Sequence, residues 1–437
     1  MWPYYPELLA IPVPRYTSFP TAAEFREDVG AADFAEVIEG TTGDVSLYVH
    51  IPFCEKICWY CGCNTSAANR TERVSNYLDS LHREIALVGD RLPNAAKISQ
   101  IAFGGGSPNA IPPLEFVRLM DALTVHFGAA EPTISIEVDP RTFSRDWAAV
   151  IEAVGIERVS LGVQTFTPAI QEAIGRVQPF DLIADTTAML RAAGVSSLNF
   201  DLMYGLPGQS LADLEETLER TMALGADRVA LFGYAHVPHI VPRQKRIDAS
   251  ALPDLKQRFE MAAAGYDQLV ASGYVPVGFD HFARPEDPLA KAAREGALRR
   301  NFQGFTEDQA PVLVGLGASA ISSFPDLLVQ NEKNPGRYRM MLSQDRLTGS
   351  RGVRRLPTDR ERGAVIEQLL CHGSARLDQN LVEEAATHLA PFVERGLAAI
   401  DRDWCTVLPE GLPYARSIAA QFDPYRQDSL RRFSSAV

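Results

Sequence analysis

The sequence predicts an α/β fold built on a parallel sheet. Between residues 45 and 232, six short apolar segments alternate with helical segments, which is the pattern of consecutive strand–helix units. Polar or glycine-rich residues follow each apolar segment directly, at the place where parallel strands end on a common rim. Because crossovers between parallel strands are right-handed, such units form a doubly wound sheet or an open or closed barrel.

Each predicted strand and helix has its own sequence pattern. The predicted strands are short segments rich in apolar residues, as expected for strands of a parallel sheet that helices cover. They are residues 45–50, 98–103, 133–138, 158–163, 197–202 and 228–232. The predicted helices repeat apolar residues every three or four positions, which gives each one a single buried face. They are residues 73–87, 114–127, 146–154, 182–193 and 211–224.

The regions on either side of the six units have different patterns. Residues 1–44 lack regular periodicity and contain the proline-punctuated segment 12–21, which predicts an extended N-terminal arm. After residue 252 the sequence predicts a long helix at 253–272, a strand at 274–279, a turn at 280–285 and mixed segments at 301–305 and 313–322. Helices follow at 360–370 and 381–395. We therefore expect an arm (1–44), an α/β unit (45–285) and a mainly helical C-terminal capping domain (286–437).

Composition narrows the class of protein. The net charge of −13 argues against a broad surface for nucleic acid or anionic membranes. No apolar run approaches the roughly 20 residues that span a bilayer, and the N-terminus lacks the basic and apolar regions of a secretory signal. Six cysteines in 437 residues are too few for a disulfide scaffold. These observations predict a cytoplasmic enzyme without a nucleic-acid or membrane partner.

Four of the six cysteines lie within residues 54–63, on the predicted loop after the first strand. Clustered thiolates on a loop are typical of a metal or iron–sulfur site. A structural zinc site usually needs a second Cys or His pair, which this chain does not offer. The spacing of Cys54, Cys58 and Cys61 suits three corners of a [4Fe–4S] cluster and leaves one iron open. S-adenosylmethionine (SAM) has an amino and a carboxylate group that can bind such an iron.

The three cysteines, with the aromatic Tyr60 before the last one, resemble the radical SAM motif. The chain as a whole resembles the oxygen-independent coproporphyrinogen III oxidase (coproporphyrinogen dehydrogenase) family, from about residue 14 onward and least strongly toward the end. The arm, the fourth cysteine Cys63 and the Asn-Phe-Gln-Gly segment at 301–304 narrow the resemblance from the superfamily to this family. The matching stretches are 14–21, 48–63, 104–108, 136–141, 162–164, 201–207, 234–238, 280–285, 301–304 and 315–322.

The resemblance implies a fold and a set of site residues. The fold is a partial (β/α)6 barrel whose open side leaves room for a tetrapyrrole. Cys54, Cys58 and Cys61 would hold the [4Fe–4S] cluster, and Cys63 would not. A first SAM would contact Tyr48, Gly105 and Glu137. A second SAM would lie near Tyr60, Gly106, Ser107, Gln164, Arg176, Asp201, Ala235 and Ile321. Glycines allow close backbone approach, carboxylates suit amino and hydroxyl groups, and an arginine can hold a carboxylate through two parallel hydrogen bonds.

The resemblance also implies the reaction. A low-potential donor such as flavodoxin or ferredoxin would reduce the cluster, and cleavage of SAM would give a 5′-deoxyadenosyl radical. The radical would remove hydrogen from the β-carbon of a propionate, after which carbon dioxide leaves and a vinyl group remains. Two such steps convert coproporphyrinogen III into protoporphyrinogen IX in anaerobic haem and porphyrin biosynthesis. No side chain is assigned a catalytic role beyond the cluster and SAM, and the chain is expected to act as a monomer.

Three alternatives stay open at this point. The first is another radical SAM protein that handles tetrapyrroles, such as a haem-opening methyltransferase. The second is a haem chaperone that binds without turnover, although such proteins usually lack an arm like residues 15–21. The third is a non-catalytic module stabilised by metal, which the six polar strand ends at one rim disfavour.

Overall fold

Six parallel strands form the centre of the molecule, as predicted. The computed structural model describes residues 2–68, 70–129 and 131–428. Strands β1, β4, β5, β6, β7 and β8 pair side by side in chain order. Because β1 and β8 are not neighbours in the sheet, the barrel stays open, and the predicted partial (β/α)6 barrel is confirmed. The six strands are Gly43–Ile51, Ala96–Gly105, Thr133–Val138, Arg158–Gln164, Ser197–Tyr204 and Arg228–Gly233.

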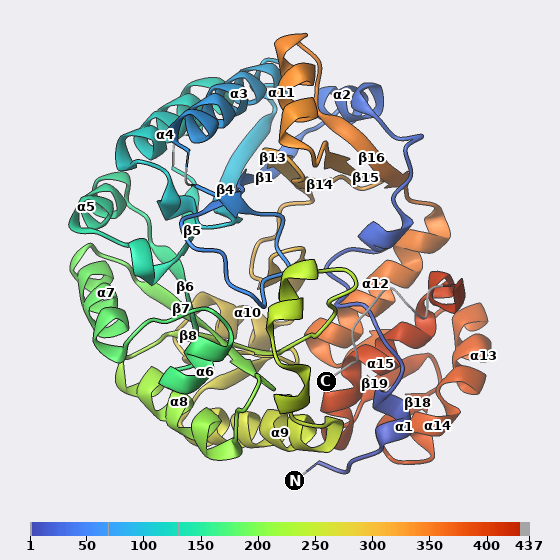
Figure 1. Ribbon diagram of the computed structural model, residues 1–437. Helices are drawn as coiled ribbons and strands as arrows, with labels where there is room; N and C mark the ends of the chain where they lie inside the picture. The colour runs from blue at the N-terminus through green and yellow to red at the C-terminus, as the bar shows by residue number, and fades with distance from the viewer. Residues whose placement is uncertain (1, 69, 130, 429–437) are drawn as a thin grey trace.

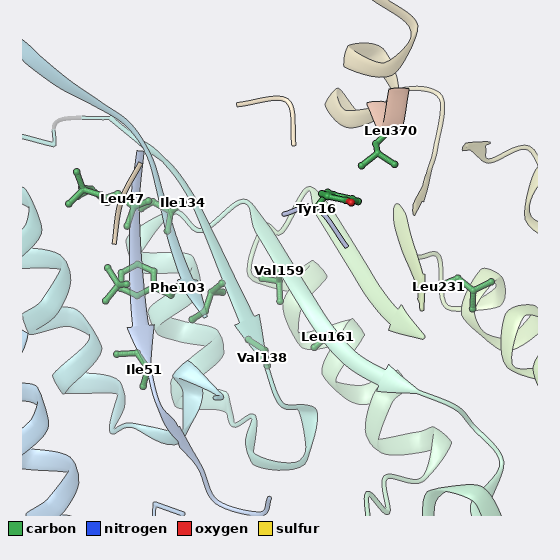
Figure 2. Packing of buried hydrophobic residues seen from close by; sticks show 14 of the residues in the cluster. Tyr16, Leu47, Ile51, Phe103, Ile134, Val138, Val159, Leu161, Leu231 and Leu370 are labelled. Carbon is green, nitrogen blue, oxygen red and sulfur yellow. The ribbon is translucent and has the colours of Figure 1, made fainter. Parts of the chain in front are cut away.

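Helices cover the outer face of this sheet. Figure 1 shows them as an outer arc, from the blue α3 to the yellow-green α9. The predicted helices are all present, as α3, α4, α5, α7, α8 and α9, and the short α6 was not predicted. Their apolar faces pack on strand residues such as Phe103, Val138 and Leu161, which are almost fully buried (Figure 2). The helices are Thr71–Gly89, Pro113–Phe127, Arg145–Val154, Pro168–Ala173, Phe180–Ala192, Leu211–Ala223 and Leu255–Ala271.

The sheet continues beyond the six strands at both edges. Next to β1 lies the parallel β13 (Val312–Leu316), followed by the antiparallel β14 (Ile321–Ser323), β15 (Leu327–Asn331) and β16 (Gly349–Arg354). Next to β8 lie β10 (His281–Ala283) and β9 (Val275–Val277), both antiparallel to their neighbours. The division of the chain at residues 44 and 285 stays a prediction, but the sheet itself extends past residue 285.

Two local predictions near β10 have different outcomes. The strand expected at 274–279 is present as the shorter β9. The turn expected at 280–285 is wrong in part, because residues 281–283 form β10 and pair with β8. A three-residue strand is too short to show an alternating pattern, and here the pairing with the exposed edge of β8 decides the conformation.

The N-terminal arm is tied to the C-terminal region. It contains two helices, α1 (Pro6–Leu9) and α2 (Ala31–Glu39). The absence of regular periodicity expected for residues 1–44 is wrong at α2, where Phe34 and Ile38 lie one turn apart on a buried face. The hydroxyl of the buried Tyr16 donates to Asp423 Oδ2 at 2.9 Å, and the backbone amide of Tyr5 donates to the hydroxyl of Tyr414 at 2.8 Å. The arm is therefore fixed against residues more than 400 positions away in the chain.

The C-terminal region is mainly helical, as predicted, and carries two small sheets. The helix expected at 360–370 lies within α12, and the one expected at 381–395 is divided between α13 and α14. Among the described residues, no helix is long and apolar enough to cross a membrane. The helices α10–α15 are Pro288–Glu295, Pro335–Ser343, Pro357–His372, Gln379–His388, Ala390–Val393 and Ala415–Ala419. The small sheets are the hairpin β11 (Arg299–Asn301) and β12 (Gly304–Thr306), and β17 (Ser374–Arg376), β19 (Trp404–Val407) and β18 (Ala398–Asp401).

Candidate active site

The cysteine loop lies at the carboxyl end of β1, on the rim where the sequence predicts a site. After Pro52 the chain forms the two-residue strand β2 (Phe53–Cys54), which pairs in parallel with β3 (Ser66–Ala67). This pairing closes the base of the loop that carries the other three cysteines. Cys54, Cys58 and Cys61 line a common cavity of about 720 Å³, including its part open to solvent. We call it the cysteine cavity.

Most of the predicted cofactor residues line the same cavity. They come mainly from β4, β5, β6 and β7 and the residues that follow these strands, with Tyr60 on the cysteine loop and Arg176 after the short α6. The prediction that strand ends gather at one rim is therefore confirmed. Tyr48, Ala235 and Ile321 are not among the residues that line it. The predicted residues that do line it are Tyr60, Gly105, Gly106, Ser107, Glu137, Gln164, Arg176 and Asp201.

The environment of the thiols favours thiolates. Two guanidinium groups donate to the sulfur of Cys58, from Arg176 Nη1 at 3.2 Å and from Arg141 Nη2 at 3.3 Å. Hydrogen bonds from Cys63 lower the pKa of Cys61 to about 6, although burial opposes this shift. Burial raises the pKa of Cys54, and the hydroxyl of Thr65, 3.2 Å away, partly offsets that effect. Positive charge and hydrogen-bond donors near a thiol stabilise the form that binds metal.

The three cysteines fit an iron–sulfur cluster better than a single metal ion. Among the residues that the structure describes, no three His, Cys, Asp or Glu side chains are grouped closely enough to hold one ion. In a [4Fe–4S] cube each thiolate binds a different iron, so the ligands surround a volume instead of converging on a point. Three thiols on the wall of one cavity satisfy that requirement. The fourth cysteine, Cys63, donates its backbone amide to Cys61 Sγ at 3.4 Å.

The glycines after β4 have a packing role in addition to the predicted one. Gly105 has a φ of +112°, which disfavours other residues, and a Cβ atom there would clash with the imidazole of His50. A Cβ atom on Gly106 would clash with the backbone of Phe53. The glycines thus let the end of β4 lie against the start of the cysteine loop. The backbone amide of Gly105 also donates to Glu137 Oε2 at 3.2 Å.

Two half-buried carboxyl groups face the cavity. Burial and the nearby charge of Asp201 raise the pKa of Glu137 to about 7. Burial also raises the pKa of Asp201, which accepts hydrogen bonds from Ser160 Oγ at 3.0 Å and from Asn199 Nδ2 at 2.8 Å. Ionising both carboxyl groups in a buried site is unfavourable unless a cation lies close to them. SAM carries a sulfonium and an amino group, and therefore fits this pair.

The pKa of Glu137 gives a test of this electrostatic description. The pKa of Glu137 is raised from 4.5 to about 7 in the folded protein, so the folded state binds this proton more tightly than the unfolded state. The contribution of this proton to the free energy of unfolding is complete below about pH 4.5. This contribution is lost as the pH rises through about 7, where the folded protein releases the proton. The metal-free Glu137→Gln protein should therefore lose less stability than the wild type between about pH 5 and pH 8, by roughly 1–3 kcal/mol. Urea unfolding at the two pH values measures this difference, and equal losses in both proteins would contradict the assignment.

Arg176 is the most strongly connected of the predicted residues. Its Nη2 donates to the carbonyl oxygen of Gly162 at 2.6 Å and lies 3.4 Å from Asp139 Oδ1. Asp139 also pairs with Arg141, at 2.6 Å between Oδ2 and Nη2. Sequence reasoning placed Asp139 among the polar strand ends but missed Arg141. Arg141 lies two residues after Asp139 in the sequence, and this short spacing between an arginine and a strand-end carboxylate could have indicated the ion pair.

The three remaining predicted residues do not line the cysteine cavity. The hydroxyl of Tyr48 is 3.1 Å from His50 Nδ1, and its ring packs edge-on against Phe302 with centroids 4.5 Å apart. Gln244 Nε2 donates to the carbonyl oxygens of Ala235 at 3.0 Å and Tyr60 at 2.9 Å, so Ala235 lies beside the cysteine loop. Ile321, on β14, lines a different cavity together with Phe302. Sequence reasoning had grouped Ile321 with the second SAM, and that role stays a prediction.

Comparisons with known proteins agree with this geometry. Residues 48–221 match the model of the radical SAM superfamily. The chain is 40% identical to an oxygen-independent coproporphyrinogen III oxidase from Bradyrhizobium diazoefficiens, over 97% of both proteins. It is 38% identical to the enzyme of that name from Escherichia coli K12, over 97% of this chain and 96% of the relative.

A solved structure agrees over nearly the full length. The crystal structure described as coproporphyrinogen III oxidase (HemN) from Escherichia coli, a radical SAM enzyme, superposes with a TM-score of 0.90 at 36% identity. The match covers 94% of this chain and 97% of that one. Membership of the radical SAM superfamily implies a [4Fe–4S] cluster and SAM as cofactors, and the donor set of the cysteine cavity fits both. This chain therefore belongs to the oxygen-independent coproporphyrinogen III oxidase family of radical SAM enzymes.

Proposed function

We propose that this chain converts two propionate side chains of coproporphyrinogen III into vinyl groups, giving protoporphyrinogen IX. The observation that carries the proposal is the cysteine cavity itself. Its three thiols share a wall with the half-buried carboxyl groups of Glu137 and Asp201, in a chain that matches this oxidase family from end to end. In each conversion a propionate loses one hydrogen, carbon dioxide and one further electron, which passes to an acceptor.

Cys54, Cys58 and Cys61 would hold the cluster through their sulfurs. When bound, the cluster and SAM supply the carbon radical that takes a hydrogen atom from the β-carbon of the propionate. Arg176 and Arg141 each donate a hydrogen bond to the sulfur of Cys58 and so hold it in place on the wall of the cavity. Cys63 polarises Cys61 through its hydrogen bonds and is not itself a ligand.

The chain would hold SAM through groups that match its parts. Glu137, with Tyr48 and Gly105, would bind the first SAM, because a buried carboxylate is stabilised by an amino group. Tyr60, Gly106, Ser107, Gln164, Arg176, Asp201, Ala235 and Ile321 would hold a second SAM. What supports this second assignment is that most of these residues line the cysteine cavity, and that Ala235 shares Gln244 with Tyr60.

The remaining task of the chain is to position the substrate and to keep water away. Burial lowers the pKa of His50 to about 4, so this imidazole is neutral near pH 7 and accepts or donates hydrogen bonds without adding charge. Holding the reactive carbon close to the radical source shortens the path of hydrogen transfer. The electron donor, such as flavodoxin or ferredoxin, the monomeric state and the cytoplasmic location stay predictions of the sequence.

One assay tests the proposal against its alternatives. The protein is reconstituted anaerobically with iron and sulfide and incubated with SAM, dithionite and coproporphyrinogen III. We expect 5′-deoxyadenosine, carbon dioxide and the vinyl product, measured by chromatography and mass spectrometry. Formation of 5′-deoxyadenosine without vinyl product would contradict the decarboxylation and leave another radical SAM reaction. Binding of haem without any turnover would instead favour a chaperone.

A further inference from the structure

A second large cavity lies beside the open side of the barrel. It has a volume of about 1240 Å³, including its part open to solvent, and is enclosed by the N-terminal arm, β11, β14 and α12. In Figure 1 the blue arm runs next to the orange α12 in this region. Its walls combine apolar side chains, among them Phe19, Phe302 and Ile321, with the arginines Arg300 and Arg355. We call it the basic cavity.

The acidic side chains of the basic cavity are already engaged. Glu367 accepts from Arg299 Nε at 2.9 Å and from the backbone amide of Arg300 at 3.0 Å. Asp359 accepts from the backbone amide of Leu356 at 2.9 Å and from the hydroxyl of Tyr425 at 2.8 Å. Among the described residues, neither carboxylate forms an ion pair with Arg300 or Arg355, although both carboxylates lie near enough to favour the charged form of a guanidinium group.

Arg300 and Arg355 lack a carboxylate partner within the part of the chain that the structure describes. The Nε and Nη2 atoms of Arg300 donate to the carbonyl oxygen of Arg15, at 3.2 and 3.1 Å, and Arg355 Nη2 donates to the carbonyl oxygen of Phe324. Arg300 Nη1 and Arg355 Nε are buried and have no hydrogen-bond acceptor among the described residues. Burial lowers the pKa of both arginines. Nearby carboxylates such as Asp280 and Glu367 offset this effect only in part. A largely desolvated guanidinium with no carboxylate at ion-pair distance is unfavourable, so an anionic ligand would stabilise the cavity.

The side chain of Arg300 is held firmly in place. Its guanidinium lies over the rings of Phe279 and Phe305, at 5.0 and 4.3 Å from their centroids. Such contacts, together with the two bonds to Arg15, fix the plane of the group. A fixed guanidinium plane suits a carboxylate, which accepts two parallel hydrogen bonds from it.

The basic cavity and the cysteine cavity both share lining residues with a third cavity that lies between them. Asn301 and Leu313 line both the basic cavity and a third cavity inside the barrel. That internal cavity shares Glu137, Ser160 and Asp201 with the cysteine cavity. In addition, Phe302 of the basic cavity packs directly on Tyr48. A bulky ligand in the basic cavity would therefore lie next to the proposed site of hydrogen transfer.

We propose that the basic cavity receives the macrocycle of the substrate, and that Arg300 and Arg355 each bind the carboxylate of a propionate that does not react. The reacting propionate then extends past Asn301 and Phe302 toward the cysteine cavity. This assignment rests on the proposed function, because it requires a tetrapyrrole that carries several carboxylates. Apolar walls for the ring and arginines for its carboxylates are the two features that such a ligand needs.

Binding of coproporphyrin III, the aromatic and fluorescent form of the substrate, tests the proposal. Titration of the reconstituted enzyme by fluorescence quenching gives Kd for the wild type, Arg300→Gln and Arg355→Gln. Since a hydrogen-bonded charge pair contributes about 1.5–3 kcal/mol, each substitution should raise Kd by roughly tenfold or more. The matched control is Arg360→Gln, because Arg360 lines the same cavity but is exposed and paired with Asp326. Its Kd should change less than about threefold.

A second ligand shows whether a variant has lost only its contact with a carboxylate or has lost its folded structure. The tetramethyl ester of coproporphyrin III, measured in the same dilute detergent, cannot form these charge pairs. Its Kd should be the same for the wild type and for both variants, whereas a general disruption would weaken both ligands equally. If Arg300→Gln does not fold, Arg300→Lys keeps the charge but not the two parallel donors, and should give an intermediate Kd for coproporphyrin III. Wild-type Kd values for Arg355→Gln and for the Arg300 variant would overturn the proposal.

Measurements of turnover show whether a negative result contradicts this proposal or the proposed function. Without tetrapyrrole, both variants should still cleave SAM slowly to 5′-deoxyadenosine at the wild-type rate, since neither arginine lines the cysteine cavity. With coproporphyrinogen III they should show a higher KM. If the wild type makes no vinyl product, the proposed function fails. If the wild type does, but the variants match it in KM and Kd, only the assignment of the basic cavity fails.

Discussion

Cys61→Ala is expected to abolish the brown iron–sulfur chromophore of the anaerobically reconstituted protein, whereas Cys63→Ala is expected to keep it. Cys61 lines the cysteine cavity, and hydrogen bonds from Cys63 lower its pKa to about 6, which favours the thiolate that binds iron. Loss of one of three ligands should reduce the bound iron to a small fraction of the wild-type content and remove SAM cleavage altogether. Iron and sulfide analysis with the absorbance spectrum near 400 nm measures the outcome.

Cys63→Ala is the matched comparison, because the two cysteines are separated by a single residue on the same loop. Alanine keeps the backbone amide that donates to Cys61 Sγ but removes the side-chain hydrogen bond, which is the larger cause of the lowered pKa of Cys61. Cys61 should therefore ionise at a higher pH, and reconstitution of this variant should require more alkaline conditions than the wild type. A colourless Cys63→Ala protein at every pH would show that the ligand set is wrong. A brown Cys61→Ala protein with full iron content would show the same.

Arg176→Met is expected to destabilise the metal-free protein by about 3–5 kcal/mol, because it leaves a buried carboxylate with one cation fewer. Arg176 bridges the carbonyl oxygen of Gly162, the sulfur of Cys58 and the carboxylate of Asp139, and its side chain is only 8% exposed. Urea unfolding measures the change. Methionine retains the apolar volume, so the loss reports mainly on the hydrogen bonds and the charge.

Arg220→Met is the control for this substitution. Arg220 pairs with Glu216 on the exposed face of α8, where an ion pair one helical turn apart contributes about 0.3–0.5 kcal/mol. The control should therefore change stability by less than about 1 kcal/mol. Equal effects of the two substitutions would contradict the structural role assigned to Arg176.

The sequence was sufficient for the six strand–helix units because each has a strong local pattern. Strands such as Ser197–Tyr204 carry apolar residues at every second position, and the helices between them have one apolar face. The rim followed from topology, since parallel strands end on the same side of a sheet. Eight of the predicted cofactor residues lie on the cysteine cavity for this reason.

What could not be predicted depends on distant partners. Residues 281–283 form a strand because β8 offers an unpaired edge, and β13 joins the sheet beside β1 although about 260 residues separate them in the chain. The N-terminal arm is fixed by bonds such as the one from Tyr16 to Asp423, for which no local pattern exists. Likewise, the environment of Arg300, whose Nη1 has no acceptor in the described part of the chain, depends on β11, the arm and α12 lying together.

The role of the glycines illustrates a prediction that was incomplete. Residues 104–106 suggested an approach of backbone to ligand, and two of them do line the cysteine cavity. The structure adds that His50 and Phe53 occupy the space where side chains at Gly105 and Gly106 would lie. A sequence alone does not distinguish between these reasons, because both require the absence of Cβ.

The most direct test of the proposed reaction follows the hydrogen atom that leaves the β-carbon of the propionate. Coproporphyrinogen III labelled with deuterium at the β-carbons of its propionates is incubated with the reconstituted enzyme, SAM and dithionite, and the 5′-deoxyadenosine is examined by mass spectrometry. If the radical derived from SAM removes this hydrogen, we expect one deuterium in the 5′-deoxyadenosine for each vinyl group formed. Vinyl product accompanied by unlabelled 5′-deoxyadenosine would contradict the proposed reaction.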